Sequence, residues 1–526
     1  MKRLKSYIAT ALLSLLLAGV AASCTGKFDD INCKEYEVTK EEMDRENYAI
    51  GATLRSLQGY VIPTQEHSYQ FIECLFAGPY AGYFGETNPK WDNSGKGSIY
   101  NPTADWLEAA FSTVIVKVYA SYRDLCDRTD DPVALALGKL MRVAIMQRET
   151  DMFGPIPYSR VLDPQGNASL TVAYDSQEAV YAQMLKELDE VTAVLKENVG
   201  IDPETFRKFD NVYFGRMDKW LRFANSLKLR FALRMAYVNP AEARRVAEAA
   251  VADGVITTNA DNAELTVEDN RASIIFNEWP DHRVGADLLC YMNGYNDPRR
   301  DKMFTKVSWQ EGGQTVQGFA GVRIGIQCAT DLSPFYSKPI ISTTSKYMWM
   351  NAAEITLLRA EGALRGWSMG GDARSLYEQG VNLSFEQYGV SDPAYLTDDT
   401  RRPQGYTDPK GTYSNTAMSN ITVPWQPGDE NFEANLERII TQKWIALFPN
   451  AVEAWSEYRR TDYPKLMPVV ANMSGGVIND AQQKIRRLWY PPTEYNENSA
   501  HLQEAIATLG GPDNGNTRLW WDKKPR

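Results

Sequence analysis

Residues 174–195, YDSQEAVYAQMLKELDEVTAVL, carry the pattern that decides the fold. Asp175 and Glu178 stand in the relation of a capping box, which marks the start of an α-helix. The apolar residues that follow at helical spacing are Val180, Met184, Leu188, Val191 and Leu195. The segment therefore predicts a helix that buries one stripe against neighbouring elements.

Similar helix signals recur along the chain. Asn239 is a predicted N-cap, Pro240 takes the first helical position, Glu242 stands three residues after the cap, and Gly254 marks the end. Further helices are expected over residues 104–125, 132–148, 218–236, 347–365, 372–388 and 432–447. Because only short clusters of Gly, Pro or Asn separate them, neighbouring helices should be antiparallel.

The pair expected over residues 347–388 is typical of closely packed helical hairpins. Its small residues are Ala352, Ala353, Ala360, Ala363 and Gly380, which allow two helix axes to approach. No strict 34-residue repeat is present. Residues 259–345 and 391–428 lack the helix signals and are expected to be loop-rich insertions. We therefore predict a mainly α fold built of repeat-like helical hairpins, with the two insertions carried on this scaffold.

The first residues indicate export. Residues 1–23 combine a basic start, an apolar run and a small-residue exit, as in a secretory signal peptide. Cys24 follows at the position of a lipobox cysteine, so residues 24–45 are expected to be a lipidated N-terminus and linker. The alternative is an ordinary cleaved leader. No later stretch reaches 18 uninterrupted apolar residues, so membrane attachment would come from a lipid anchor.

Charge and motif content exclude several function classes. The formal net charge of -11 disfavours nucleic acid as a partner, since such binding depends on Lys and Arg neutralising phosphates. The six cysteines form no C-x-x-C pair, and His67, His282 and His501 are too far apart for a local metal motif. Neither a nucleophile elbow nor a phosphate or dinucleotide loop is present. We expect no cofactor and no catalysis, and no residue is assigned to a metal. A calcium site at Asp127, Asp130 and Asp131 stays open, although a solvated helix end is the favoured interpretation.

Several segments together resemble the SusD/RagB family of outer-membrane nutrient-binding lipoproteins, in its SusD-like branch. In order, they are residues 144–158 (AIMQRETDMFGPIPY), 174–190, 220–235 (WLRFANSLKLRFALRM), 297–299 (DPR), 353–366 (AEITLLRAEGALRG), 442–444 (QKW), 453–455 (EAW), 459–464 (RRTDYP) and 487–491 (RLWYP). The acidic Asp29 and Asp30 shortly after Cys24 also resemble the surface-export signal of Bacteroides-type lipoproteins. The alternative is that they solvate a linker.

The resemblance implies a tetratricopeptide-like scaffold of helical hairpins that forms one domain over residues 46–526, and a role in nutrient capture. A protein of this kind covers the extracellular mouth of a SusC-like, TonB-dependent β-barrel, binds a glycan or a peptide, and closes to deliver it. Most residues of the matching segments are interpreted as structural: Trp220, Phe223, Trp444 and Trp455 occupy helical faces where core packing is the default. Arg459, Arg460 and Asp462 fit either a buried ion-pair network, which we favour, or the transporter interface.

Two aromatic-rich loops are the candidates for ligand contact. Exposed rings flanked by Asn, Asp or Arg suit sugars, which offer an apolar face and a rim of hydroxyls. The residues are Tyr83, Trp91 and Asn93 in the first loop and Trp279, Tyr291, Asn293, Tyr295 and Trp309 in the second. The alternative is that these rings pack their loops onto the scaffold. A glycan importer, a peptide importer and a surface glycoside hydrolase all stay open, and the glycan importer is favoured.

The mature protein should carry fatty acyl chains on Cys24, because the lipobox places that thiol at the new N-terminus. Mass spectrometry of the N-terminal peptide tests this, and fractionation should place the protein at the outer face of the outer membrane. An unmodified Cys24 thiol, or a protein free in the periplasm, would contradict the importer hypothesis.

Overall fold

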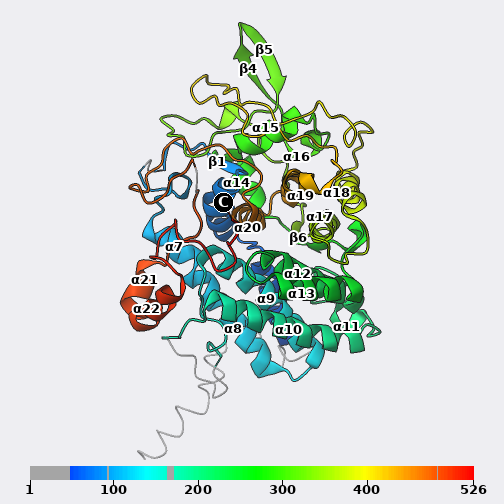
Figure 1. Ribbon diagram of the computed structural model, residues 1–526. Coiled ribbons are helices and arrows are strands. Elements are labelled where there is room, and N and C mark those ends of the chain that lie inside the picture. The colour runs from blue at the N-terminus through cyan, green and yellow to red at the C-terminus, as the bar shows by residue number, and fades with distance from the viewer. Residues whose placement is uncertain (1–47, 92–93, 163–170, 482–483, 526) are drawn as a thin grey trace, which may run out of the picture. The chain divides into compact units, whose positions relative to one another are not determined.

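The computed structural model of the protein describes residues 48–91, 94–162, 171–481 and 484–525 (Figure 1). Its internal contacts divide the chain into two units, Met1–Ile50 and Gly51–Arg526, and the second unit contains nearly all of the described residues. The predicted leader, Cys24, the linker to residue 45 and Asn93 lie outside the described residues.

Helices dominate the described chain. They are α4 (Tyr48–Val61), α5 (Glu66–Tyr69), the π-helical η2 (Gln70–Phe76), α6 (Ala77–Tyr80), α7 (Ala104–Ala110), α8 (Ser112–Arg128), α9 (Pro132–Phe153), α10 (Gln177–Glu197), α11 (Glu204–Arg207), α12 (Met217–Arg234), α13 (Pro240–Asp253), α14 (Ala272–Asn277), α15 (Ala286–Gly294), α16 (Arg300–Met303), α17 (Ala352–Leu364), α18 (Ala373–Tyr388), α19 (Phe432–Leu447), α20 (Ala451–Thr461), α21 (Pro492–Glu497) and α22 (Ser499–Thr508). The mainly α prediction is confirmed.

The strands form three small antiparallel pairs. They are β1 (Phe84–Glu86) with β3 (His282–Val284), β2 (Ala263–Leu265) with β6 (Tyr347–Met350), and β4 (Val307–Glu311) with β5 (Gln314–Gly318). The β4–β5 hairpin projects from the helical body at the top of Figure 1, and it turns at Gly312 and Gly313, both with positive φ. No larger sheet occurs in the described part of the chain.

The helices pack as the expected hairpins. Helix α10 lies between α9 and α12, α13 packs on α12, and α17 packs on α18 and α19. The predicted apolar stripe of α10, from Val180 to Leu195, is at most 1% exposed. The helix starts one residue later than predicted, however: Ser176 is the N-cap and accepts a hydrogen bond from the Ala179 amide. Asp175 instead accepts hydrogen bonds from Ser159.

Close approach in the second hairpin depends on a glycine. A Cβ on Gly380 of α18 would come within 2.6 Å of the Leu357 side chain on α17, so a larger residue would push the helices apart. The caps of α13 also match the prediction, with Asn239 accepting from Glu242 and Gly254 ending the helix at positive φ. The small residues therefore act as predicted, by setting the spacing of helices.

Three predicted segments differ from the structure. Residues 104–125 are split at Phe111 into α7 and α8. Residues 347–350 extend as β6 before α17 begins, because they pair with β2 instead of continuing the helix. Residues 259–345 hold α14, α15, α16 and strands β2–β5, and are thus far more ordered than a loop-rich insertion. Residues 391–428, all described, are irregular as expected apart from the Tyr406–Asn415 bridge.

A buried ion network joins the helices. Arg234 of α12 pairs with Asp151 of α9 at 3.2 Å, with Glu453 of α20 at 2.6 Å, and also with Glu457. Arg460 of α20 binds both Glu457 and Glu361 of α17 at 2.6 Å. Further members are Lys443 of α19, which pairs with Glu457, and Arg230 of α12, which pairs with Glu354 of α17.

This network confirms the structural interpretation of Arg460, whose side chain is fully buried. Burial acts to raise the pKa of Glu361, but Arg460 and Arg365 lower it to about 2, so the carboxylate stays charged. The tryptophans predicted for the core are also buried: Trp220, Trp444 and Trp455 are at most 2% exposed. Residues of the family segments therefore form the interior.

Removing Arg460 should destabilise the fold strongly. An Arg460→Met change leaves Glu361 and Glu457 buried without their shared guanidinium, which costs about 3–5 kcal/mol in comparable pairs. Urea unfolding measures the loss. The matched control is Arg374→Met on α18, which breaks the exposed pair with Glu378 and should change stability little. Equal stability of the two variants would contradict a central role for the network.

Candidate functional site

Three of the candidate ligand-binding tyrosines belong to the core. Tyr83, Tyr291 and Tyr295 are at most 2% exposed. The Tyr83 hydroxyl donates to the Trp444 carbonyl, and the Tyr83 ring stacks on the Trp444 indole at 5.7 Å. The hydroxyls of Tyr291 and Tyr295 donate to main-chain carbonyls, of Lys465 and Ile421 respectively. The expected exposed position of these rings is therefore corrected: Tyr291 lies within α15, Tyr295 directly follows that helix, and Tyr83 packs against Trp444, so all three face the core.

Trp91 lies on a half-exposed surface that we call the aromatic ledge, formed by Phe71, Trp91 and Trp106. The Trp91 and Trp106 rings meet edge to face at 5.6 Å, and Phe71 lies 6.2 Å from Trp106. All three side chains are neither buried nor fully exposed. The ledge therefore combines residues of a loop, η2 and α7 into one run of accessible aromatic surface.

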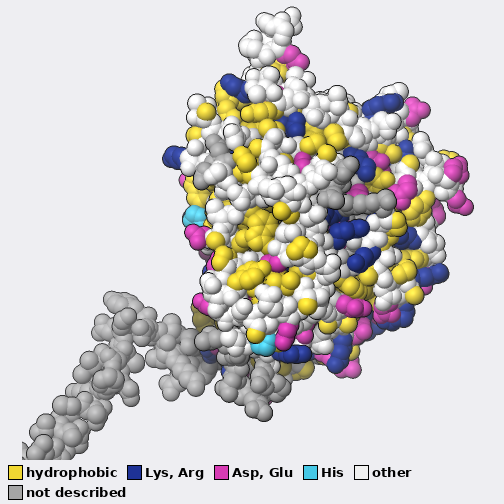
Figure 2. Space-filling model, turned by 60° about the vertical axis from the view of Figure 1, so that its left-hand side comes forward, with side chains coloured by type: hydrophobic (Ala, Val, Ile, Leu, Met, Phe, Trp, Pro, Cys, Tyr) yellow, Lys and Arg dark blue, Asp and Glu magenta, His cyan; other side chains and the backbone are white. Residues whose placement is uncertain are grey.

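Trp279 lies against the same helical segment. Its indole stacks on the exposed imidazole of His67 with ring centroids 5.5 Å apart and an interplanar angle of 22°. His67 and Phe71 are four residues apart on the continuous α5–η2 helix, a spacing that places side chains on one face. The His67–Trp279 pair thus extends the accessible aromatic surface beyond the ledge. The side of the molecule that carries α7 comes forward in Figure 2, where hydrophobic side chains gather across the middle of the face.

A buried polar cluster supports the ledge from behind. The His282 imidazole meets the Trp91 ring edge to face at 5.1 Å. Its Nε2 lies 3.2 Å from Gln70 Nε2, which also donates to Asp281 at 2.8 Å, and Asn88 donates to the same carboxylate. Burial lowers the pKa of His282 to about 3, and the positive charge of Arg283 acts in the same direction. A neutral imidazole therefore backs Trp91 at physiological pH.

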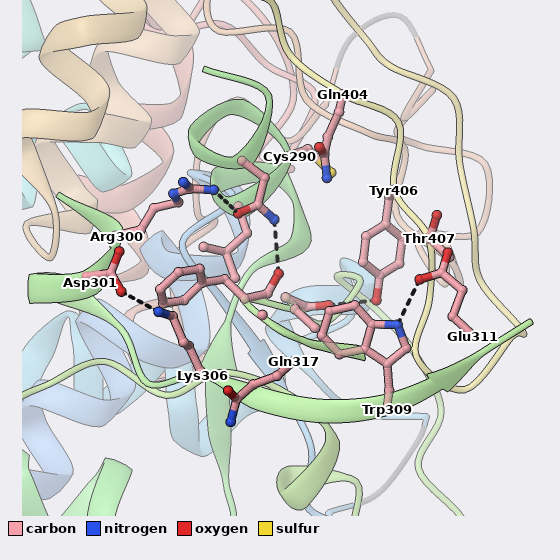
Figure 3. A pocket seen from close by; sticks show the side chains of 16 residues that line it. Cys290, Arg300, Asp301, Lys306, Trp309, Glu311, Gln317, Gln404, Tyr406 and Thr407 are labelled. Carbon is pink, nitrogen blue, oxygen red and sulfur yellow. Dashed lines mark hydrogen bonds and ion pairs between the residues drawn. The ribbon is translucent and has the colours of Figure 1, made fainter. Parts of the chain in front are cut away.

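The other two described candidates, Asn293 and Trp309, meet in a second place. They line a cavity of about 470 Å³ between α15, α16, the β4–β5 hairpin and the loop around Tyr406, which we call the hairpin cavity (Figure 3). Trp309 packs partly against a buried cluster that includes Val322 and Tyr336, so one side of its indole is fixed. Asn293 donates to the Phe319 carbonyl at 3.0 Å.

Charged side chains surround the mouth of this cavity. Arg300 and Lys306 both lie over the Phe319 ring, at 5.5 and 5.4 Å from its centroid. Lys306 forms an ion pair with Asp301 at 2.6 Å, and Glu311 accepts a hydrogen bond from the Trp309 indole at 3.3 Å. The hairpin cavity is thus more polar than the aromatic ledge.

Sequence reasoning missed several residues of both surfaces. Phe71 and Trp106 belong to helical segments, where an aromatic side chain is expected in the core. Arg300 follows the Asp297–Arg299 segment, which the resemblance marked as structural, and Gln404 and Thr407 come from the second insertion. The available signal was the high aromatic and Asn content around residue 300, which located the region but not the residues.

The described residues contain neither a metal-binding cluster nor a membrane-spanning helix. No cluster of three or more His, Cys, Asp or Glu side chains there could hold a metal ion. Likewise, none of the helices within the described ranges has the length and apolar character needed to cross a bilayer. Asp131, directly before α9, is the N-cap of that helix and accepts hydrogen bonds from the amides of Val133 and Ala134.

Comparison with known proteins identifies the family. The family model described as "Susd and RagB outer membrane lipoprotein" matches residues 30–522. The chain belongs to the SusD-like family. Its members are outer-membrane lipoproteins that take part in nutrient binding at the cell surface, and they are binding proteins rather than enzymes. The resemblance seen in the sequence is confirmed.

Solved structures agree with this SusD-like assignment. A SusD homolog from Bacteroides thetaiotaomicron is 50% identical, with 91% of this chain and 100% of that chain covered at a TM-score of 0.86. A SusD homolog from Bacteroides ovatus is 40% identical, with coverage of 91% and 99% and a TM-score of 0.85. A chitin-binding SusD homolog from Flavobacterium johnsoniae is 37% identical, with coverage of 90% and 99% and a TM-score of 0.83. No curated protein matches the chain.

The buried imidazole predicts a pH dependence of stability. The pKa of His282 is about 3 in the fold and about 6.5 in an unfolded chain, so between these values only the unfolded chain binds the proton. The stabilising contribution is complete above about pH 6.5 and falls, by about 1 kcal/mol per pH unit, as the pH drops toward 3. Urea unfolding from pH 7 to 4 should show a steeper loss for the native protein than for His282→Gln. Identical slopes would contradict a neutral His282.

Proposed function

We propose that this SusD-like protein captures a glycan at the cell surface and delivers it to a SusC-like, TonB-dependent outer-membrane barrel. The observation that carries the proposal is the aromatic ledge. Phe71, Trp91 and Trp106 form one run of partly exposed rings. Rings that served only to pack the core would be fully enclosed. Such a surface has an energetic cost in water unless a ligand covers it.

The ledge suits sugars on physical grounds. A sugar ring has an apolar face of C–H groups, which packs on the face of an indole, and a rim of hydroxyls, which needs hydrogen bonds. Trp91 is held by neighbours on both sides, Trp106 and His282, so little side-chain entropy is lost when it meets a ligand. The His67–Trp279 pair adds a second aromatic contact, as a chain longer than one sugar unit requires.

The family and the helical scaffold both support the proposed delivery of the glycan to the barrel. In the proposed cycle, acyl chains on Cys24 tether the protein to the outer membrane, and the helical body closes over a SusC-like barrel as a lid. A lid must move as one piece, and the charge network through α9, α12, α17, α19 and α20 joins the helices that would have to move together. One relative of similar fold is described as chitin-binding, which supports a glycan as the cargo here.

Replacing Trp91 with alanine should abolish retention of the protein in native gels that contain the cognate polysaccharide. Losing one stacking contact on an aromatic side chain costs about 1–3 kcal/mol, or roughly fivefold to more than a hundredfold in affinity. The matched control is Trp425→Ala, which removes another half-exposed tryptophan, one that packs on Tyr377 away from the ledge. It should leave retention unchanged.

A panel of neutral and acidic polysaccharides serves as the probe. Retention by at least one member, lost in Trp91→Ala and kept in Trp425→Ala, is the expected result. Binding of peptide pools with no retention by any polysaccharide would replace the glycan with a peptide cargo. Turnover of a glycan, lost on replacing a single carboxylate, would overturn the proposal in favour of a hydrolase.

A further inference from the structure

We infer that the hairpin cavity binds a carboxylate-bearing sugar residue, such as a hexuronic or a sialic acid, and that Arg300 receives its carboxylate. The inference rests on the proposed function, because it takes the ligand to be a glycan. It adds a second binding site, apart from the residues of the aromatic ledge, and a chemical class of ligand for it.

The contacts of Arg300 lead to this inference. Its guanidinium donates to the Asp297 carbonyl at 2.9 Å, to Asn293 Oδ1 at 2.9 Å and to Asn296 Oδ1 at 2.6 Å. All three acceptors are neutral, and within the described ranges no carboxylate forms an ion pair with this guanidinium. A guanidinium has five N–H donors, so donors are left for a ligand.

The nearest carboxylate is already engaged. Both oxygens of Asp297 bind the fully buried Arg299, at 2.9 and 2.5 Å, and Tyr395 donates to the same carboxylate at 2.7 Å. The two neighbouring arginines therefore differ in their surroundings. Arg299 is neutralised inside the fold, whereas the hydrogen-bond acceptors of Arg300 at the cavity are all neutral oxygen atoms.

The remaining charges of the cavity do not replace a ligand. Asp301 is neutralised by Lys306 at 2.6 Å, and Glu311 lies exposed on the hairpin, where water screens its charge. Partial burial lowers the pKa of Arg300 by more than the carboxylates of Asp297 and Asp301 raise it. The guanidinium is therefore under-solvated, and an incoming carboxylate would restore the missing electrostatic stabilisation.

The walls of the cavity suit a sugar ring. Trp309 offers a partly exposed indole, and Figure 3 shows Arg300 and Trp309 on opposite sides of the same space, with Gln404 and Tyr406 above. Gln317, Gln404 and Thr407 are exposed polar side chains that can bind hydroxyls. The volume of about 470 Å³ lies within the range of ~300–1,000 Å³ that is typical of small-molecule sites.

An acidic sugar fits this combination better than a peptide end. A peptide carboxylate would use Arg300, but the three neutral polar side chains and the flat indole match the hydroxyls and the apolar face of a sugar. Among the cations of the lining, Lys306 pairs with Asp301, whereas Arg300 forms no ion pair within the described ranges, which corresponds to one carboxylate per bound residue. Neutral sugars would bind without drawing on that charge.

The test measures binding of single sugars to the purified full chain by titration calorimetry and ligand-observed NMR. The probes are glucuronate, galacturonate and N-acetylneuraminate, with glucose and galactose as neutral counterparts. At least one acidic sugar should bind more tightly than the neutral sugars. Arg300→Gln should weaken that binding by about tenfold or more, the usual effect of losing a charge-assisted hydrogen bond, and Arg300→Lys should retain part of it.

Matched controls separate binding from folding. Arg374→Gln makes the same change at an exposed arginine of α18 and should leave binding intact. Thermal unfolding of Arg300→Gln shows whether the loop of Asn293 and Asn296 is still held. If Arg300→Gln unfolds at a lower temperature than the unaltered protein, the inference is tested only by comparing acidic with neutral sugars on the unaltered protein.

Each remaining outcome has one meaning. Equal binding of acidic and neutral sugars, no binding of any acidic sugar, or equal weakening of both classes by Arg300→Gln overturns the inference. So does Arg300-dependent binding of a short peptide without binding of the acidic sugars. Because polysaccharide retention is measured separately, the two failures can be told apart. No retention of the unaltered protein by any polysaccharide would refute the proposed function, whereas retention without acidic-sugar binding would refute only this inference.

Discussion

Charge buried between helices is the constraint on which the rest of this structure depends. Arg234, Arg460 and Lys443 converge on Glu457 of α20, and their other partners lie on α9, α17 and α20. Each charge is stable there only because its partners are in place, since a buried ion without its counter-ion costs several kcal/mol. Apolar stripes alone would tolerate small slides between helices. The network fixes their register as well as their contact.

That rigidity determines where function can lie. The interior is filled by residues of the family segments, so ligand contact falls to side chains that the scaffold leaves at its surface. Two such surfaces occur, and they are supported differently. A buried polar cluster of Gln70, Asn88, Asp281 and His282 backs the aromatic ledge. The hairpin cavity is lined by Arg300, a cation whose hydrogen-bond acceptors are neutral.

These differences correspond to two tasks in glycan capture. The ledge provides non-directional apolar contact over several rings, which tolerates different linkages and suits a long chain. The hairpin cavity provides a directional charge at one point, which discriminates between chemical groups. A protein with both would gain affinity along the chain and selectivity at one residue, and the two contributions would combine through effective concentration on a shared polymer.

The sequence by itself determined the secondary structure and the fold class. Helix caps and periodicity are local signals, so α10, α13 and α18 lie within a residue or so of their predicted positions. Spacing between helices was also predictable from Gly380 and the alanines of α17. The leader and Cys24 belong to the same class of local pattern.

The two surfaces proposed for ligand binding were decided only by the tertiary structure. Tyr83 and Trp91 come from one aromatic loop, yet Tyr83 packs under Trp444 while Trp91 meets Trp106 at the surface. Whether a ring faces inward depends on partners hundreds of residues away, such as His282, which no local pattern encodes. The same holds for Arg299 and Arg300: they are adjacent in the sequence, but only the packing of Asp297 and Tyr395 decides which of the two charges stays free for a ligand.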